Sequence, residues 1–205
     1  MEEQSKVRIP KQKRSIDKKD KILAAAYQLF CEAGYYKTTT PEVAKKGGVS
    51  IGCLYSYFAD KNDLFMAVLD RYDGQFDALR LEALRSLDDR DIPLKDSFRR
   101  LLGELVAIHK ASKALNAEMK LLYHSDAAIA ARMDARDAKI RAAILSSIKA
   151  NKKRLRVKDL EAAAEIAADI TGAIVDRIVF GKAALDGDRI LNAGVEALCL
   201  YLEIK

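Results

Sequence analysis

Residues 38–61, TTTPEVAKKGGVSIGCLYSYFADK, decide the fold of the first third of the chain. The stretch begins with a T-x-x-E capping box from Thr39, which predicts a short helix at about 40–47. A Gly-Gly pair ends that helix, and Ser50 is a good N-cap for a second helix that runs to Phe58. Two short helices separated by a glycine turn predict a helix-turn-helix.

Longer helices are predicted on both sides of this motif. Before it, apolar residues recur at helical spacing, at Ile22, Ala26, Leu29, Phe30 and Ala33. Gly34 can end this helix in the left-handed conformation that other residues avoid. After the motif, Asp60 is placed to cap a long helix that keeps one apolar face to about residue 85.

The rest of the chain also predicts helices, since the whole sequence has only three prolines and ten glycines. Beyond an acidic turn they are expected at about 94–111, 114–124, 126–150, 158–184 and 188–203. The last two are apolar on more than one side, which indicates burial by their own domain and by a second subunit. The predicted class is therefore all-α, with about nine helices.

Positive charge is concentrated at the N-terminal end. Residues 1–61 hold 12 Lys and Arg against 7 Asp and Glu, whereas the remainder holds 24 against 23. This distribution is typical of a nucleic-acid-binding end on a neutral body, and a merely solvated tail is the alternative. We expect a flexible basic arm at 1–15, a helix-turn-helix domain at 16–61 and a helical ligand-binding and dimerisation domain at 62–205.

Several classes of protein are disfavoured by the sequence. Its three cysteines are widely spaced, which argues against a disulfide framework or a metal site and favours the reducing cytoplasm. The chain shows no export signal and no membrane span. It has two histidines and none of the familiar enzyme motifs, so neither an enzyme nor a cofactor is predicted, apart from a small-molecule effector.

Residues 18–72 resemble the tetracycline-repressor (TetR/AcrR) family of helix-turn-helix transcriptional regulators. The shared features occur in order: A-x-x-L-F, G-Y-x-x-T-T, V-A-x-x-G-G-V-S, L-Y-x-Y-F and K-x-x-L. The resemblance implies a homodimer that binds a double-stranded DNA operator, with the helices at about 158–184 and 188–203 forming the interface. A two-fold dimer would set two recognition helices about 34–36 Å apart, which favours a palindromic operator.

The resemblance also implies which residues contact DNA. One or both of Tyr55 and Tyr57 would bind phosphates, although one of them can instead pack against the first helix. Lys61 would contact phosphate, unless it is only solvated. Thr39 and Thr40 would combine capping with a phosphate contact. The residues expected near the bases are Ser50, Ile51, Gly52, Cys53 and Ser56, with Lys45 and Lys46 close by.

Two of these residues need comment. Many family members carry a basic residue where this chain has Ile51, and an isoleucine can touch a thymine methyl but cannot clasp a guanine. The operator sequence is therefore not transferable from relatives. Cys53 suggests a redox switch, but a small packing residue is the favoured interpretation because no group that would lower its pKa is expected nearby.

A small-molecule pocket is expected in the C-terminal domain, as in other members of this family. Its candidate residues are polar or adaptable groups set within apolar stretches, namely His109, Asn116, Met119, Tyr123, His124, Asp169, Thr171 and Asp176. Each of them can equally be an ordinary hydrogen-bonded core or surface residue.

Together these features predict a sequence-specific transcriptional regulator. The expected mechanism is repression that ends when an inducer binds the helical domain and shifts the recognition helices. Activation is an alternative to repression. A non-specific DNA-binding protein and, with less support, a helical enzyme are the competing functions.

Overall fold

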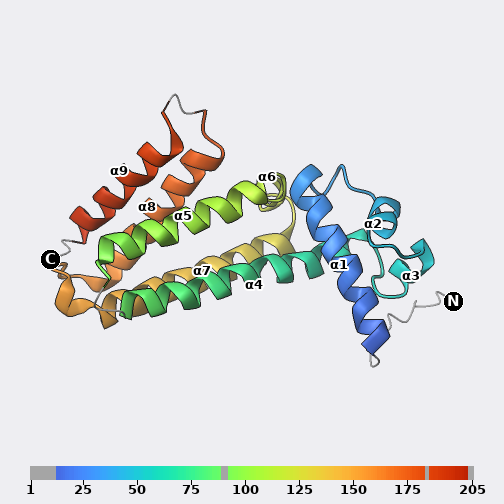
Figure 1. Cartoon of the computed structure of the whole chain (residues 1–205), viewed down its shortest axis with the longest axis horizontal. Coiled ribbons are helices and arrows are strands. Elements are labelled where there is room, and N and C mark those ends of the chain that lie inside the picture. Colours follow the sequence, from blue (N-terminus) through green and yellow to red (C-terminus); the bar gives the residue numbers. More distant parts are fainter. Residues whose placement is uncertain (1–12, 89–91, 183–184, 203–205) are drawn as a thin grey trace. The chain divides into compact units, whose positions relative to one another are not determined.

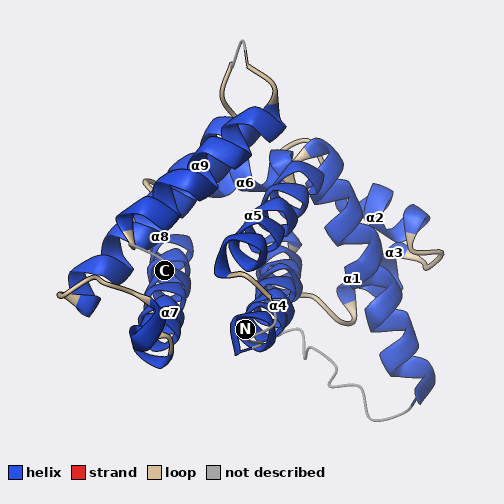
Figure 2. Ribbon diagram, turned by 60° about the vertical axis from the view of Figure 1, so that its left-hand side comes forward, coloured by secondary structure: helices blue, strands red, loops and turns tan. Residues whose placement is uncertain are grey.

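The structure is a computed structural model and describes residues 13–88, 92–182 and 185–202. In this part of the chain every regular element is helical, and no strand occurs (Figure 1; Figure 2). The α-helices are α1 (Lys13–Ala33), α2 (Thr40–Lys46), α3 (Ile51–Tyr55), α4 (Lys61–Asp88), α5 (Leu94–Ala111), α6 (Lys113–Leu122), α7 (Ala127–Ala150), α8 (Leu160–Val179) and α9 (Gly187–Tyr201). One 3-10 helix, η1 (Lys152–Arg154), follows α7. The all-α prediction is confirmed.

Several helix bounds differ by a few residues from the sequence prediction. The predicted arm at 1–15 lies mostly outside the described residues, and its last three residues already belong to α1. Helix α3 ends at Tyr55 instead of Phe58, because the Ser56 amide and hydroxyl both donate to the carbonyl oxygen of Cys53 and tighten the last turn. Helix α8 ends at Val179 instead of 184, with Phe180 as its C-cap.

The chain forms two compact units. The first contains residues 1–75 and 114–120, and the second contains 76–113 and 121–205. The first unit therefore extends beyond the boundary expected at residue 61, to include half of α4 and most of α6. In the described part of the chain, no helix combines the length and apolar composition needed to cross a bilayer.

Large apolar side chains from several helices fill the core of the first unit. Phe30 of α1 and Phe65 of α4 meet edge to face, with ring centroids 5.4 Å apart. Helix α6 contributes to the same unit, because the Tyr72 hydroxyl donates a 2.6 Å hydrogen bond to Oδ1 of Asn116 and both residues are buried. Other side chains of this core with almost no exposure include Ile22, Leu54, Leu64, Leu69, Leu115 and Met119.

The second unit is a bundle in which α5, α7, α8 and α9 pack on one another. One of its apolar clusters joins α5, α8 and α9 through Leu102, Ala167, Ile174, Leu191, Val195 and Leu198. Arg141 ties α7 to α8, since its guanidinium contacts Asp137 on its own helix and Glu165 and Asp169 on α8. Gly194 lets α9 approach α8 closely, because a Cβ there would overlap the side chain of Ile174.

Gly194→Ala is expected to destabilise the second unit by about 1–3 kcal/mol, since the added methyl group overpacks the α8–α9 contact. The same change at Gly74 is the control, because a Cβ on this exposed position of α4 would meet no atom within 4 Å. Gly74→Ala should stabilise the protein by roughly 0.5–1 kcal/mol. Urea unfolding followed by circular dichroism measures both. Equal effects of the two substitutions would contradict this account of the close approach.

Candidate nucleic-acid interface

The start of α2 is fixed by a reciprocal capping box. The Thr39 amide donates to Oε2 of Glu42 at 2.8 Å, and the Glu42 amide donates to Oγ1 of Thr39 at 3.4 Å. The hydrogen bonds from the Thr39 side chain and backbone hold the pKa of Glu42 below its usual value. Since all of these contacts lie within four residues, the position of α2 relative to the preceding turn is set locally.

The turn between α2 and α3 is closed by backbone hydrogen bonds. The Gly47 amide donates to the Val43 carbonyl at 2.8 Å, and the Val49 amide donates to the Ala44 carbonyl at 3.0 Å. Gly48 has φ +64°, in the left-handed region that favours glycine. Ser50 then caps α3, because its Oγ accepts the Cys53 amide at 3.1 Å.

Helix α3 has one anchored side and one exposed side. Leu54 is 0% exposed and Phe58, just beyond the helix, is 2% exposed. Ile51 and Tyr55 are 42% and 43% exposed, so they form the accessible side. The Tyr55 hydroxyl lies 2.8 Å from Oγ1 of Thr40, which links α3 to the start of α2.

The predicted DNA contacts differ in accessibility. Seven are exposed, namely Thr39, Lys45, Lys46, Ser50, Ile51, Gly52 and Tyr55. Cys53, Ser56 and Lys61 are half-buried, and Cys53 is a free thiol. Thr40 and Tyr57 are buried. Tyr55 and Tyr57, which the sequence predicted as equivalent candidates for a phosphate contact, therefore differ in exposure. Lys46 also lies 3.4 Å from Oε2 of Glu32.

Lys61, the first residue of α4, is held against an aromatic ring. Its Nζ lies 4.3 Å from the ring centroid of Tyr35, a cation–π distance. Burial lowers the pKa of Lys61, while the carboxylates of Glu118 and Glu42 act in the opposite direction. The amine is therefore positioned by its surroundings, unlike a lysine that is only solvated.

Glu118 of α6 is a residue that the sequence did not single out. Its carboxylate accepts the backbone amides of Tyr35 and of Tyr36, the latter at 3.3 Å. Gly34, with φ +87°, makes room for it, because a Cβ there would overlap the carboxylate. Glu118 thus holds the turn that leads from α1 into α2 by hydrogen bonds, and its carboxylate lies close enough to Lys61 to act on its charge. No local sequence signal marks it, since the contact spans more than 80 residues.

The predicted pocket residues are distributed over both units and have ordinary partners. Asn116 and Met119 are buried in the first unit. In the second unit, His109 Nδ1 donates to the Leu105 carbonyl at 2.8 Å. The Tyr123 hydroxyl donates to Asp134 at 2.9 Å, which raises the pKa of Tyr123. His124 and Asp176 are exposed, Thr171 is half-buried, and Asp169 binds Arg141.

The second unit has a groove of about 210 Å³, and it does not coincide with the predicted pocket residues. Its lining comes from α5, α8 and the start of α9, and consists of Gly103, Val106, Ala107, Lys110, Ile178, Gly187, Asp188 and Leu191. None of the eight predicted pocket residues lines it. The structure therefore does not gather the predicted set around this groove.

Comparison with known proteins matches the first unit to a regulator family. Residues 22–68 match the model described as bacterial regulatory proteins, tetR family. The HTH-type transcriptional regulator HbdR of Aromatoleum sp. (strain CIB) is 43% identical over 63 residues, which are 29% of this chain and 28% of HbdR. The HTH-type transcriptional regulator QacR of Staphylococcus aureus is 46% identical over 52 residues, 25% of this chain and 28% of QacR.

Solved structures share the fold over nearly the whole chain. GusR of Salmonella enterica has a TM-score of 0.71 at 19% identity, covering 95% of this chain and 100% of that one. A TetR transcription regulator from Haloarcula marismortui has a TM-score of 0.71 at 20% identity, covering 92% and 97%. The sequence matches span only 28% of HbdR and QacR, so the second unit is similar to known regulators in fold alone.

Glu118→Ala is expected to speed hydrogen exchange at the Tyr35 and Tyr36 amides by at least about tenfold, because a hydrogen bond to a charged acceptor is lost. NMR-detected exchange of the full chain measures this residue by residue. Glu104→Ala, which removes an exposed glutamate from α5, is the control. Unchanged protection at both tyrosine amides would mean that Glu118 does not hold the turn.

Proposed function

We propose that the chain, whose residues 22–68 match the model of the TetR family of bacterial regulatory proteins, is a transcriptional regulator that recognises a DNA sequence through α3. The observation that carries the proposal is the two-sided character of α3. Leu54 anchors the helix, and Ile51 and Tyr55 remain exposed. A short helix presented in this way suits insertion into the major groove.

The exposed side of α3 supplies the base contacts in this proposal. Ser50 caps the helix, Ile51 and Gly52 begin it, and all three are exposed, whereas Cys53 within the helix and Ser56 at its C-cap are half-buried. Ile51 offers an apolar contact to a thymine methyl group, which favours a thymine at that position of the half-site. Thr39, Tyr55 and Lys61 surround these residues as phosphate contacts, which fix register without reading sequence.

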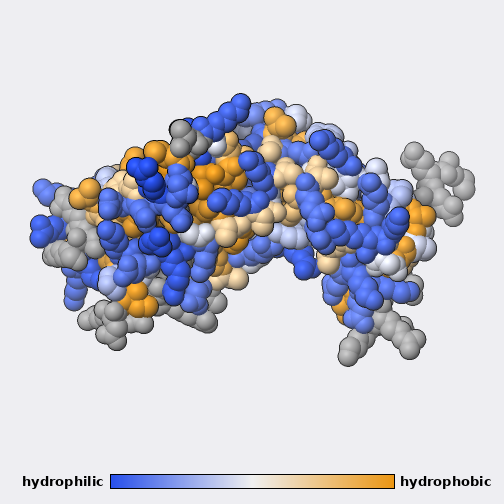
Figure 3. Space-filling view, turned by 45° about the horizontal axis from the view of Figure 1, so that its top comes forward, coloured by the Kyte–Doolittle hydropathy of each residue, from blue (hydrophilic) through white to orange (hydrophobic). Residues whose placement is uncertain are grey.

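The active form is proposed to be a homodimer joined through α8 and α9. These helices expose large apolar side chains, because Leu200 is 77%, Ile166 42% and Tyr201 36% exposed. Apolar residues are visible on the surface of the second unit in Figure 3. Covering such side chains with a second copy is favourable. A two-fold dimer then requires a palindromic operator, with half-sites about 34–36 Å apart.

A small molecule that binds the second unit is proposed to release the protein from DNA in the cytoplasm. Residues 114–120 of α6 belong to the first unit, and Glu118 holds the turn before α2. Movement of α6 would therefore act directly on the helix-turn-helix. Ligand and DNA affinities are then coupled reciprocally. Repression relieved by an inducer is the form we propose, because it needs no additional partner.

Selection of bound fragments from a random DNA pool tests the function. The purified full chain should enrich a palindrome with half-sites about one helical turn apart. Competition with unrelated duplex separates this outcome from general DNA binding. Recovery of unenriched DNA would overturn sequence recognition and leave a non-specific binder.

Lys61→Met should weaken binding to the selected operator and to its single-base variants by similar factors, since the lysine contacts phosphate. The slope of log K against log salt should fall by about 1. Fluorescence anisotropy over a range of salt concentrations measures both quantities. Lys139→Met, an exposed lysine of α7, is the control. A change in base preference without a change in slope would place Lys61 away from phosphate.

A further inference from the structure

The connection between α7 and α8 concentrates the positive charge of the second unit. Residues 149–158, KANKKRLRVK, hold six Lys and Arg and no Asp or Glu, and are called the basic turn below. The rest of residues 62–205 holds 18 Lys and Arg against 23 Asp and Glu. Outside this turn, residues 62–205 therefore carry a net charge of −5, from 18 positive and 23 negative side chains.

The basic turn is anchored to the bundle. Leu155 is buried in a cluster that includes Leu94, Ile148 and Leu202. The Arg156 amide donates to the Leu202 carbonyl at 3.4 Å. Within η1, the Arg154 amide donates to the Asn151 carbonyl at 2.8 Å. The cations therefore project from a fixed backbone, and less conformational entropy is lost when they bind an anion.

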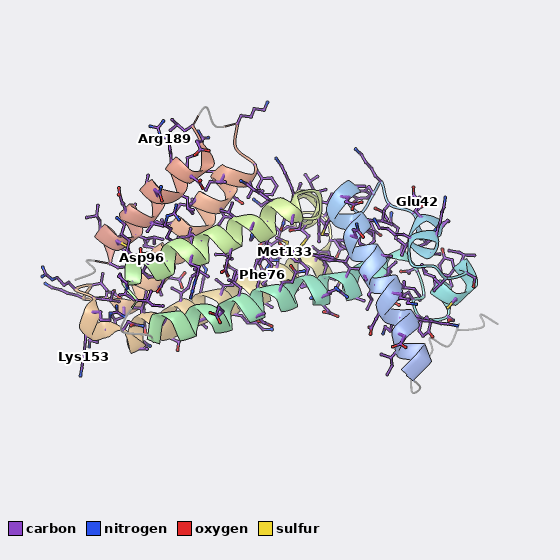
Figure 4. All side chains as sticks on the ribbon, viewed as in Figure 1. Glu42, Phe76, Asp96, Met133, Lys153 and Arg189 are labelled. Carbon is purple, nitrogen blue, oxygen red and sulfur yellow. The ribbon has the colours of Figure 1, made fainter. Side chains whose placement is uncertain are left out.

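Most of these cations are available to a partner. Lys152, Lys153, Arg156 and Lys158 are exposed, and among the described residues no carboxylate forms an ion pair with any of them. Lys149 lies 3.8 Å from Glu161. Figure 4 shows Lys153 extending away from the bundle.

Nearby carboxylates leave the turn positive. Asp159 accepts the Ala162 amide at 3.0 Å as the N-cap of α8. The Arg154 guanidinium donates a 3.4 Å hydrogen bond to the Ile92 carbonyl, which is not a carboxylate.

We propose that the basic turn binds the phosphates of double-stranded DNA independently of sequence, as a second contact separate from α3. Clustered cations gain affinity by releasing the counterions condensed on a duplex. An anionic membrane fits less well, because Leu155 is buried and Val157 half-buried, which leaves no large exposed apolar side chain to insert. A protein partner fits less well too, since protein interfaces are enriched in aromatic residues and depleted in lysine.

The consequence is bridging of two DNA segments by one protein. While α3 binds the operator, the basic turn can bind another duplex or a distant part of the DNA molecule that carries the operator. This activity goes beyond operator recognition because the second segment needs no particular sequence. It should weaken steeply with salt, with a log–log slope of about −0.9 for each phosphate contact.

Capture of a second duplex tests the proposal. Full-length protein is bound to bead-tethered operator from the selection experiment, and a fluorescent duplex of unrelated sequence is added at low salt. Wild type should retain the second duplex. K152A/K153A/R156A should retain at least about tenfold less, because three phosphate contacts are lost. Its affinity for the operator should stay within about twofold of wild type, since α3 is unchanged.

The matched control is K139A/K182A/R189A, which removes two lysines and one arginine from exposed positions elsewhere in the second unit. It should behave as wild type in both assays. K152E/K153E is a second variant of the turn, and it leaves the backbone contacts of Arg154 and Arg156 in place. Unchanged thermal unfolding shows that each variant is folded.

Any of three results would overturn the proposal. The first is that the wild-type chain captures no second duplex. The second is that the control variant loses capture as much as the turn variant, and the third is that the turn variant loses operator binding to the same extent as capture. Binding of wild type to phosphatidylserine vesicles in place of duplex would assign the turn to a membrane instead. A failed operator selection with intact duplex binding would overturn the proposed function and leave the basic turn testable by direct titration.

Discussion

Burial of Leu54 is the interaction on which the candidate interface depends. A five-residue helix is too short to be stable alone in water, because the cost of nucleating it is spread over too few hydrogen bonds. Complete burial of one leucine contributes about 1.5–3 kcal/mol, and the Ser50 cap adds about 1 kcal/mol. Helix α3 therefore exists because the core of the first unit, which buries Leu54 completely, holds it. Its orientation is inherited from that core, which fixes the direction of the exposed Ile51 and Tyr55.

Two kinds of contact position this element, and they differ in range. The capping box at Thr39 and the Gly47–Gly48 turn act within a few residues, and they determine where α2 and α3 begin and end. Glu118 acts from α6, far away in the sequence, and holds the turn before α2 through two backbone amides. The local contacts make the motif, whereas the distant contact connects it to a helix whose ends belong to the other unit.

This difference in range explains how much the sequence alone could predict. Caps, glycine turns and apolar periodicity are local, so the order of the helices and most of their bounds followed from them. Burial of Tyr57 but exposure of Tyr55 depends on where α3 lies in the core, and the early end of α3 depends on how its last turn tightens. Glu118 and the residues around the groove at Lys110 belong to contacts between distant segments, for which a single sequence gives no pattern.

The effect of charge on binding also depends on which residues lie close together. Electrostatic interactions in water are screened over about 8–10 Å at physiological salt, so a partner responds to the charges beside it and not to the total of a domain. Residues 62–205 are nearly neutral in total, yet six of their 24 Lys and Arg lie in the ten residues of the basic turn, which contain no Asp or Glu. A net charge near zero for a whole domain therefore does not exclude a polyanionic partner. The placement of cations on a rigid element, here fixed by the buried Leu155, determines whether they act together on a polyanion.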